Sequence, residues 1–193
     1  MKPSIINKGK SSIFIDFRFI GYNNALMALR QVITWGDPRL KDKNQDVGDW
    51  TPELEQLAAD MFETLAAQDG AGLAAPQLGI NIRLAVVDIS GGADPSQKRI
   101  LINPEILREE GEQIGEEGCL SIPGVQEVLK RPMKVWVRSR KPDGSWEELE
   151  GEEFLARALC HEIDHLRGRL FVEYLGPVKR GIIQRKYQKQ HRD

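Results

Sequence analysis

The stretch LARALCHEIDHLRGRLF, residues 155–171, carries two of the chain's three histidines, His161 and His165, on either side of Glu162. Its apolar residues recur at helical spacing and a glycine follows them, which predicts a helix over about residues 152–166. Residues four apart lie on one face of a helix, so both imidazoles can point at one metal ion. Glu162 is rotated by about 100° from His161 and would reach a water on that ion rather than the ion itself.

A second interpretation is that both histidines are core residues bonded to backbone or water. Phe154 and Ala158 extend the histidine row, so this face of the helix is expected to be buried or to line a pocket. Burial alone fits either interpretation. An H-E-x-x-H motif in a chain with only three histidines favours the metal site.

A catalytic metal site usually has three protein ligands and one position open to water, so a third ligand is needed. His191 lies in a polar tail and is a poor candidate, whereas the downstream acid Glu173 is a possible ligand. Cys119, in GEEGCLSIPG (residues 115–124), could supply a thiolate, and the adjacent Gly118 would let backbone approach the ion or a substrate. The residues alone leave Cys119 open between a ligand and a small buried side chain.

The segment GAGLAAPQLG, residues 70–79, matches G-x-G-x-x-A, a pattern typical of dinucleotide binding. That interpretation is rejected, because the motif needs a strand before it and a helix after it, and the predicted order here is reversed. We expect a tight loop whose glycines let a substrate backbone approach, with Gln77 as an amide donor. The alternative is a helix-to-strand connection without chemistry.

Composition describes an ordinary globular domain. With 193 residues, of which 40% are hydrophobic and 29% charged, the chain suffices for one domain with a full core. A net charge of −2 gives no reason to expect nucleic-acid or membrane binding over the whole surface. The two cysteines fit a reducing compartment, and Cys160 should point away from the histidine face and pack. No run of 18 apolar residues is present.

The remaining elements are predicted from periodicity and turn signals. A helix is expected over residues 51–70, with Thr51 as its cap and Gly70 at its end. Val135 and Val137 should share one side of their strand. Strands are expected in NIRLAVVDIS (81–90), RILINPEI (99–106), KVWVRSR (134–140) and WEELEGEE (146–153). This order predicts an α+β fold: a single domain with small mixed or antiparallel sheets around a central H-E-x-x-H helix.

The chain divides into three parts. Residues 1–26 are expected to be a leader or extension that can be disordered; an alternative start at Met27 or an added leader is preferred over a targeting peptide or a structural extension. Residues 27–176 form the predicted catalytic domain. Residues 177–193 form a basic tail that is expected to be helical. Its basic residues are Lys179, Arg180, Arg185, Lys186, Lys189 and Arg192.

Three segments together resemble the peptide deformylase family. The family's G-x-G-x-A-A-x-Q is matched by residues 70–77, its E-G-C-[LV]-S by residues 117–121, and its H-E-x-D-H by residues 161–165. The resemblance extends from about residue 29 to residue 175, and the three motifs together are highly specific. Several relatives carry a basic residue where this chain has Gln126, a departure that concerns substrate contacts rather than chemistry.

The resemblance implies a metal-dependent hydrolase that removes the formyl group from N-formylmethionine at the start of new bacterial or organellar proteins, releasing formate. It implies that Cys119, His161 and His165 hold one divalent ion, with water in the fourth position. Fe²⁺ is the family's usual native ion, and Zn²⁺, Ni²⁺ or Co²⁺ can replace it. Glu162 would act as general base and then acid. The Gln77 amide and the Leu120 backbone N–H would donate to the oxygen that becomes negative.

The same resemblance implies how a substrate would lie. Ala71, Gly72 and Gly118 would pair with the backbone of an extended peptide. Phe154 and Ala158 would line the pocket for the methionine side chain.

Two carboxylates are candidates for the bonds that orient the imidazoles. Glu117 and Asp164 would take this role, and a plain surface carboxylate is the alternative for Asp164.

Two other functions remain open at the level of sequence. A metalloendopeptidase could use the same helix motif, and a non-catalytic metal-binding module could hold the ion without turnover. The basic tail allows a ribosomal contact, although a solvated terminal helix is the simpler interpretation. No DNA or membrane partner is expected. The expected location is the bacterial cytoplasm, or an organelle if residues 1–26 act as a transit peptide.

Overall fold

The computed structural model describes residues 29–190. The expectations for residues 1–26 and for His191 therefore lie outside the described residues. An antiparallel sheet runs in the order β1-β2-β3-β6-β7, and a two-stranded hairpin joins β4 and β5. The strands are β1 (Gly72–Ala74), β2 (Leu84–Val87), β3 (Arg99–Glu110), β4 (Gln113–Gly118), β5 (Gln126–Arg131), β6 (Lys134–Arg140) and β7 (Trp146–Glu152).

In the part of the chain that the structure describes, three α-helices and four short 3₁₀ helices complete the fold, and the expected α+β class is confirmed. They are α1 (Pro52–Ala67), α2 (Glu153–Leu166), α3 (Pro177–Gln190), η2 (Pro38–Lys41), η3 (Ala75–Leu78), η4 (Pro95–Gln97) and η5 (Phe171–Tyr174). Parallel pairing, which a mixed sheet would need, is limited in the described residues to an isolated bridge between Gln45 and Ile82.

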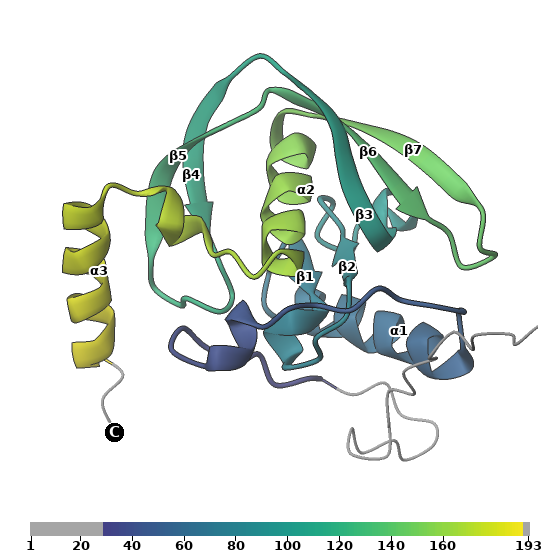
Figure 1. Cartoon of the computed structure of the whole chain (residues 1–193), viewed down its shortest axis with the longest axis horizontal. Helices are drawn as coiled ribbons and strands as arrows, with labels where there is room; N and C mark the ends of the chain where they lie inside the picture. The colour runs from purple at the N-terminus through teal and green to yellow at the C-terminus, as the bar shows by residue number, and fades with distance from the viewer. Residues whose placement is uncertain (1–28, 191–193) are drawn as a thin grey trace, which may run out of the picture.

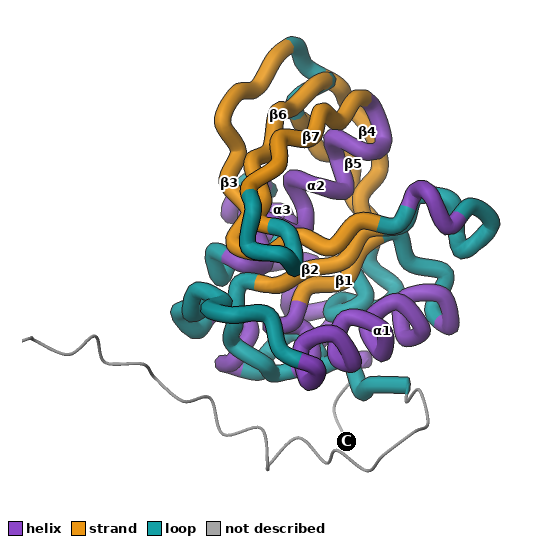
Figure 2. The backbone as a smooth tube through the Cα atoms, turned by 90° about the vertical axis from the view of Figure 1, so that its right-hand side faces the viewer, coloured by secondary structure: helices purple, strands orange, loops and turns teal. Residues whose placement is uncertain are grey.

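The β1–β2–β3 end of the sheet lies between two helices, because its strands are apolar on both faces. Side chains on one face, such as Leu73 and Val86, join the cluster formed with α1. Side chains on the other face, such as Ala74 and Val87, join the cluster formed with α2. Figure 2 shows α1 running below β1 and β2. This sandwich fixes β1 against the helix that carries the histidines.

Helix α2 occupies the centre of the molecule, between the β4–β5 hairpin and the large sheet (Figure 1). Val135 and Val137 of β6 are fully buried in the α2 cluster, as their alternation predicts. Cys160 packs in the same cluster at 4% exposure, which confirms its predicted packing role. Burial raises the pKa of its thiol to about 12, so Cys160 is not available as a thiolate ligand.

Two local expectations are corrected. Helix α1 starts on the Thr51 cap as predicted, but it ends at Ala67, and Asp69 rather than Gly70 adopts the left-handed conformation, with φ 49°. Gly70 instead leaves room for packing, since a Cβ there would lie 2.6 Å from a Leu65 methyl carbon. Residues 70–79 are not a plain loop: they form β1 and then η3, because Leu73 and the alanines around it are apolar enough to bury.

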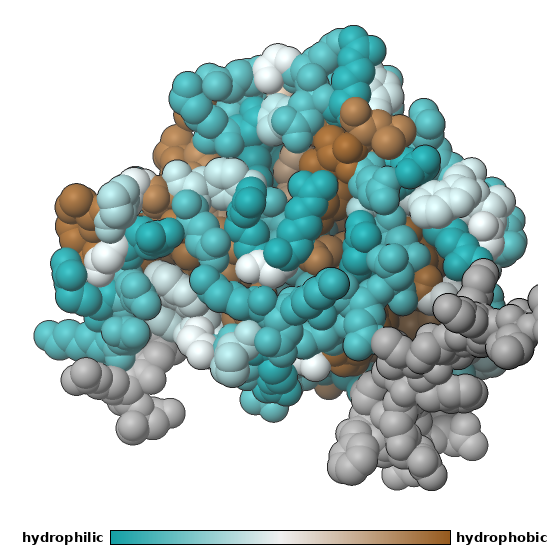
Figure 3. All heavy atoms as spheres, viewed as in Figure 1, coloured by the Kyte–Doolittle hydropathy of each residue, from teal (hydrophilic) through white to brown (hydrophobic). Residues whose placement is uncertain are grey.

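The C-terminal helix α3 packs beside the hairpin. Tyr187 is 4% exposed, and its ring lies 5.4 Å from that of Trp35. Figure 3 shows a mostly hydrophilic face with hydrophobic side chains exposed over the start of α3, where Val178 and Ile182 are 77% and 54% exposed. Within residues 29–190 no helix is long and apolar enough to cross a bilayer.

Candidate metal centre and substrate cleft

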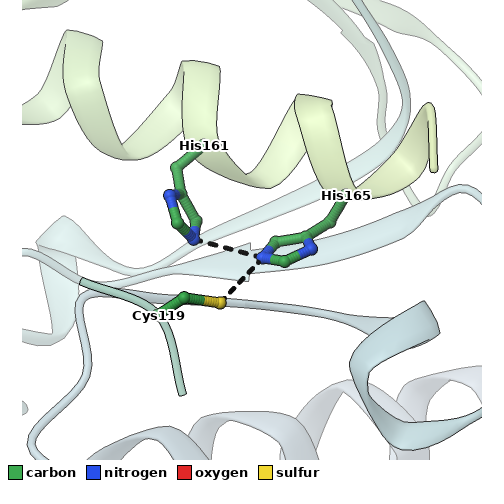
Figure 4. Close-up of side chains that lie close together, drawn as sticks. All are labelled: Cys119, His161 and His165. Carbon is green, nitrogen blue, oxygen red and sulfur yellow. Dashed lines mark hydrogen bonds between the residues drawn. The ribbon is translucent and has the colours of Figure 1, made fainter. Parts of the chain in front are cut away.

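Cys119, His161 and His165 meet at one point although they come from distant segments. The histidines lie one turn apart on α2 and Cys119 directly follows β4 (Figure 4). Their ligand atoms all lie within 4.8 Å of one another. His165 Nε2 lies 3.1 Å from His161 Nε2 and 3.2 Å from Cys119 Sγ.

The other candidate for the third ligand, Glu173, lies outside this group. Glu173 forms an ion pair with Lys41 at 2.9 Å and is not part of this group.

The three donors fit a divalent cation. Tetrahedral Cys and His ligands at 2.0–2.3 Å from an ion lie roughly 3.4–3.8 Å from one another, close to the 3.1 and 3.2 Å that separate His165 Nε2 from His161 Nε2 and Cys119 Sγ. Two imidazole nitrogens and a sulfur face each other with no carboxylate between them, an arrangement that only a shared proton or a cation can satisfy. The donor set suits a borderline or soft transition metal.

The electrostatics of the two imidazoles differ. Burial and the neighbouring His161 lower the pKa of His165, which keeps it in the neutral, metal-binding form. Burial also opposes a charge on His161, but its bonds to Cys119 and Glu117 outweigh that effect and raise its pKa. The group therefore attracts positive charge at its centre.

Glu117 orients His161 and is itself held by two arginines. Its Oε1 lies 2.7 Å from His161 Nδ1, so the histidine proton belongs on Nδ1 and Nε2 is left free for an ion. Arg131 donates to both carboxylate oxygens, at 2.6 and 2.9 Å, and Arg157 Nη1 donates at 3.1 Å. Burial alone would raise the pKa of Glu117, but the bonds from Arg131 and His161 hold it at about 2.

Asp164 is not a surface carboxylate, so the surface alternative is wrong. It is 5% exposed and accepts hydrogen bonds from Arg131 Nη1 at 2.7 Å and from the Tyr174 hydroxyl at 2.9 Å. Neither of these bonds involves an imidazole. Asp164 contacts Arg131, Arg131 contacts Glu117, and Glu117 contacts His161. Asp164 therefore acts on His161 only indirectly.

Glu162 lies beside the metal group and faces β1. It is 2% exposed, and burial raises its pKa to about 7 even though His161 lowers it in part. Its Oε2 has no hydrogen-bond partner among the described residues. A Cβ at Gly72 would lie 2.3 Å from Glu162 Oε1, so the carboxylate rests directly against the Gly72 backbone. A buried, unpaired carboxylate at this place can take up a proton near neutral pH.

Gln77 presents its amide N–H groups to the same site. Its Oε1 accepts from the Ala74 backbone N–H at 2.8 Å, which turns Nε2 towards Cys119 Sγ, 3.5 Å away, and Ser121 Oγ, 3.3 Å away. Leu120 follows Cys119 and also lines the cleft. Gln77 therefore places an amide donor beside Cys119 at the wall of the cleft.

A cleft of about 630 Å³ opens from the metal group. All five residues expected to contact substrate line it: Ala71, Gly72, Gly118, Phe154 and Ala158. Phe154 is 54% exposed at the cleft surface, whereas Ala158 is buried at 6% exposure. The Ala71 carbonyl accepts from the Asp88 N–H at 2.9 Å, so along β1 it is Gly72 whose backbone groups point to the free edge.

Sequence reasoning missed both arginines. Arg157 precedes His161 by four residues and so lies on the histidine row, a signal that helical spacing offers. It lines the cleft at 5% exposure, and a Cβ at Gly115 would lie 3.1 Å from its Nη2, so that glycine leaves it space. Arg131 gave no such signal, because its position depends on the register of the β4–β5 hairpin.

Comparisons with known proteins give the same family that the three motifs indicate. The family model for polypeptide deformylase matches residues 29–181. The peptide deformylase of Acidobacterium capsulatum is 45% identical over 166 residues, covering 86% of this chain and 98% of that protein. The peptide deformylase of Caldanaerobacter subterraneus subsp. tengcongensis is 52% identical over 147 residues, covering 76% and 89%.

A solved structure of this family has the same fold. The crystal structure of a peptide deformylase from Legionella pneumophila superposes with a TM-score of 0.79 at 42% identity, covering 84% of this chain and 95% of that one. The chain therefore belongs to the polypeptide deformylase family, a family of metal-dependent hydrolases that remove the formyl group from the amino terminus of new polypeptides.

Proposed function

We propose that this member of the family releases formate from N-formylmethionyl peptides, using one divalent cation held by Cys119, His161 and His165 and proton transfer by Glu162. The convergence of the three ligand atoms within 4.8 Å, beside a buried carboxylate and at the base of a cleft, carries the proposal. A divalent cation held there would supply Lewis acidity, which lowers the pKa of a water from 15.7 towards about 7 and polarises the formyl oxygen.

Glu162 then handles the protons. Its carboxylate takes a proton from the attacking water and gives it to the nitrogen of the leaving amine, for which a pKa of about 7 is well matched. The Gln77 amide and the Leu120 backbone N–H donate to the former formyl oxygen as it becomes negative. Because this charge exists only after attack, such donors stabilise the transition state more than the substrate.

The methionyl peptide lies along the free edge of β1. Gly72 offers its backbone groups on this edge, Ala71 contributes its side chain, and Gly118 lines the opposite wall of the cleft. Phe154 and Ala158 take the methionine side chain. Fe²⁺ is the proposed native ion, with Zn²⁺, Ni²⁺ or Co²⁺ able to replace it, since a thiolate with two imidazoles binds all four.

A location and a partner complete the proposal. The chain works in the bacterial cytoplasm, where formylated nascent chains arise, and its basic helix α3 contacts the ribosome. The exposed cations of α3 support this contact.

Two variants test the chemistry. Glu162→Gln should retain the metal and lose about 10²–10⁴-fold in turnover, because it removes only the proton-transfer group. Cys119→Ala should lose metal on dialysis, measured by elemental analysis. Formate release at the parental rate by Glu162→Gln, or full metal content in Cys119→Ala, would contradict the assigned roles. An unformylated copy of the same peptide should remain intact; cleavage of an internal bond would favour a metalloendopeptidase.

A further inference from the structure

Asn44 caps the C-terminal end of helix α2 from a distant part of the chain. It follows η2 and is 8% exposed, and its Nδ2 donates to the carbonyls of His165 at 3.2 Å and of Leu166 at 3.0 Å. The last carbonyls of a helix have no N–H four residues further along the helix, so a side-chain donor at this end satisfies them. A residue of the metal group is thus held at its backbone by a side chain that lies 121 positions earlier.

The segment that carries this asparagine is fixed to the large sheet. The next residue, Gln45, donates its N–H to the Asn81 carbonyl at 3.0 Å and accepts from the Arg83 N–H at 2.8 Å, directly before β2. Val47 exchanges two hydrogen bonds of 2.8 Å with the side chain of Asn103, which belongs to β3. The capping amide is therefore anchored to the start of β2 and to β3, and it fixes the end of α2 relative to them.

The turn after α2 packs directly against the same segment. Gly168 has a φ of 71°, and a Cβ there would lie 3.1 Å from the Lys41 carbonyl oxygen. The Gly168 N–H donates to the His165 carbonyl at 3.0 Å, so this close contact begins at the histidine itself. The end of α2 and the segment around Asn44 therefore form one contact, in which the position of one sets that of the other.

The two histidines are oriented in different ways. His161 has a side-chain partner, since its Nδ1 lies 2.7 Å from Glu117 Oε1. His165 Nδ1 is buried and has no hydrogen-bond partner within residues 29–190, and Figure 4 shows it on the side of the ring away from Cys119. The position of the His165 ring therefore follows from packing and from the backbone of the last turn of α2, which Asn44 holds.

We propose that Asn44 is a positioning residue for the metal centre: it holds the last turn of α2 so that His165 Nε2 meets a cation together with Cys119 and His161. The inference rests on the cation site of the proposed function and adds a residue to it. Asn44 contacts the backbone of a ligand and not the reacting groups. It therefore acts on the affinity and geometry of cation binding, and proton transfer by Glu162 does not depend on it directly.

The test compares Co²⁺ binding by Asn44→Ala with that of the parent, both as the full chain. The dissociation constant, measured by competition with a chelating dye, should rise about 10–100-fold, the usual effect of removing a group that orients a metal ligand. The charge-transfer band from the Cys119 thiolate to Co²⁺ should remain, whereas the d–d bands should change because an imidazole ligand has moved. Asn44→Ser gives a second variant if the alanine variant does not fold: its hydroxyl can bind water in the space of the amide but is too short to reach both carbonyls.

A matched control separates positioning from overall stability. Thr51→Ala removes the cap of α1, where the Thr51 side chain accepts from the Leu54 N–H at 3.4 Å, and within residues 29–190 this helix contributes nothing to the metal group. Loss of either cap should lower the urea midpoint of the metal-free chain, but only the Asn44 variants should bind Co²⁺ more weakly. Parental affinity and d–d bands in the Asn44 variants would overturn the proposal. An equal loss of affinity in Thr51→Ala would overturn it too, because the effect would then be one of stability.

Formate release from formyl-Met-Ala amide, measured on the same Co²⁺-loaded parent, keeps the two proposals distinguishable. Release by the parent together with unchanged Co²⁺ affinity in the Asn44 variants sinks the positioning role alone. Co²⁺ binding that depends on Asn44 in a chain that releases no formate sinks the proposed deformylation and leaves the positioning role standing.

Discussion

Gly72 is the residue on which the position of Glu162 depends. Its φ is ordinary, so its backbone would accept alanine, yet a Cβ there would lie 2.3 Å from Glu162 Oε1 and 2.6 Å from its carboxyl carbon. Glycine is needed at this position for space rather than for conformation. The family motif around residues 70–77 therefore has a steric basis: it lets a carboxylate lie flat against an edge strand.

Gly72→Ala should accordingly reduce turnover while leaving the metal in place. The added methyl group displaces the Glu162 carboxylate, and a misplacement of about 1 Å in a catalytic group can cost about 10²-fold. We expect a loss of kcat of this order, with metal content unchanged by elemental analysis. Gly176→Ala is the matched control, because a Cβ there meets nothing within 4 Å. Parental turnover in Gly72→Ala would show that Glu162 need not occupy this position.

At the scale of elements, the β4–β5 hairpin and α2 are joined by a buried network of charges. Glu117 of β4 accepts from Arg131 of β5 and Arg157 of α2, and Arg131 also reaches Asp164. Removing one member leaves an uncompensated charge in the interior, which is why such networks are costly to break. The same network fixes the His161 ring, so stability and metal geometry share residues.

The network predicts a loss of stability in acid. The folded pKa of Glu117, about 2, is below the ordinary value of 4.5, so its contribution is complete above pH 4.5 and disappears as the pH falls towards 2. The shift corresponds to about 3 kcal/mol of unfolding free energy. Urea unfolding in a chelator, which removes any contribution of metal release, should show this loss. Glu117→Gln should flatten the profile over that window, whereas Glu148→Gln, which removes an exposed carboxylate of β7, should not. An unchanged slope in Glu117→Gln would place the acid sensitivity elsewhere.

Local sequence signals predicted helices, strands and the two histidine ligands on one helix face. The residues that other elements bring to the site depend on the topology and could not be predicted in this way. The spacing of His161 and His165 and the cap at Thr51 act within one turn of helix, so they can be recognised without a fold. Choosing Cys119 over Glu173 required the family resemblance. The end of β4 lies close to α2 only in the folded chain, and local sequence patterns do not show this. Arg131 and the buried environment of Asp164 depend on hairpin register for the same reason.

At the scale of the whole molecule, the segment around Ile33 and Trp35 connects the η3 segment with the loop after Cys119. The Ile33 N–H donates to the Gln77 carbonyl and the Trp35 N–H donates to the Ser121 carbonyl, each at 2.8 Å. Trp35 also packs on Tyr187 of α3. No periodic pattern marks these residues, so sequence reasoning had no means of finding them. Segments outside the cleft lining thus help to hold its two walls in place.

Helix α3 is separate from the chemistry, and this makes its proposed ribosome contact testable. It contributes no residue to the cleft lining within residues 29–190. It is anchored through Tyr187, whereas Arg185 and Lys186 are exposed. Arg185→Glu/Lys186→Glu should therefore abolish co-sedimentation with ribosomes at low salt and leave hydrolysis of short formyl peptides at the parental level, because binding to RNA phosphates depends on cations.

The control for this prediction reverses two cations elsewhere. Lys43→Glu/Lys141→Glu changes the net charge equally but leaves α3 intact, so it should still co-sediment. If both double variants lose binding together, the attraction is a property of overall charge and α3 is a solvated terminal helix. If neither loses binding, the ribosome is bound through another surface. Only loss confined to the α3 variant, reversed in the parent by raising the salt concentration, supports docking through this helix.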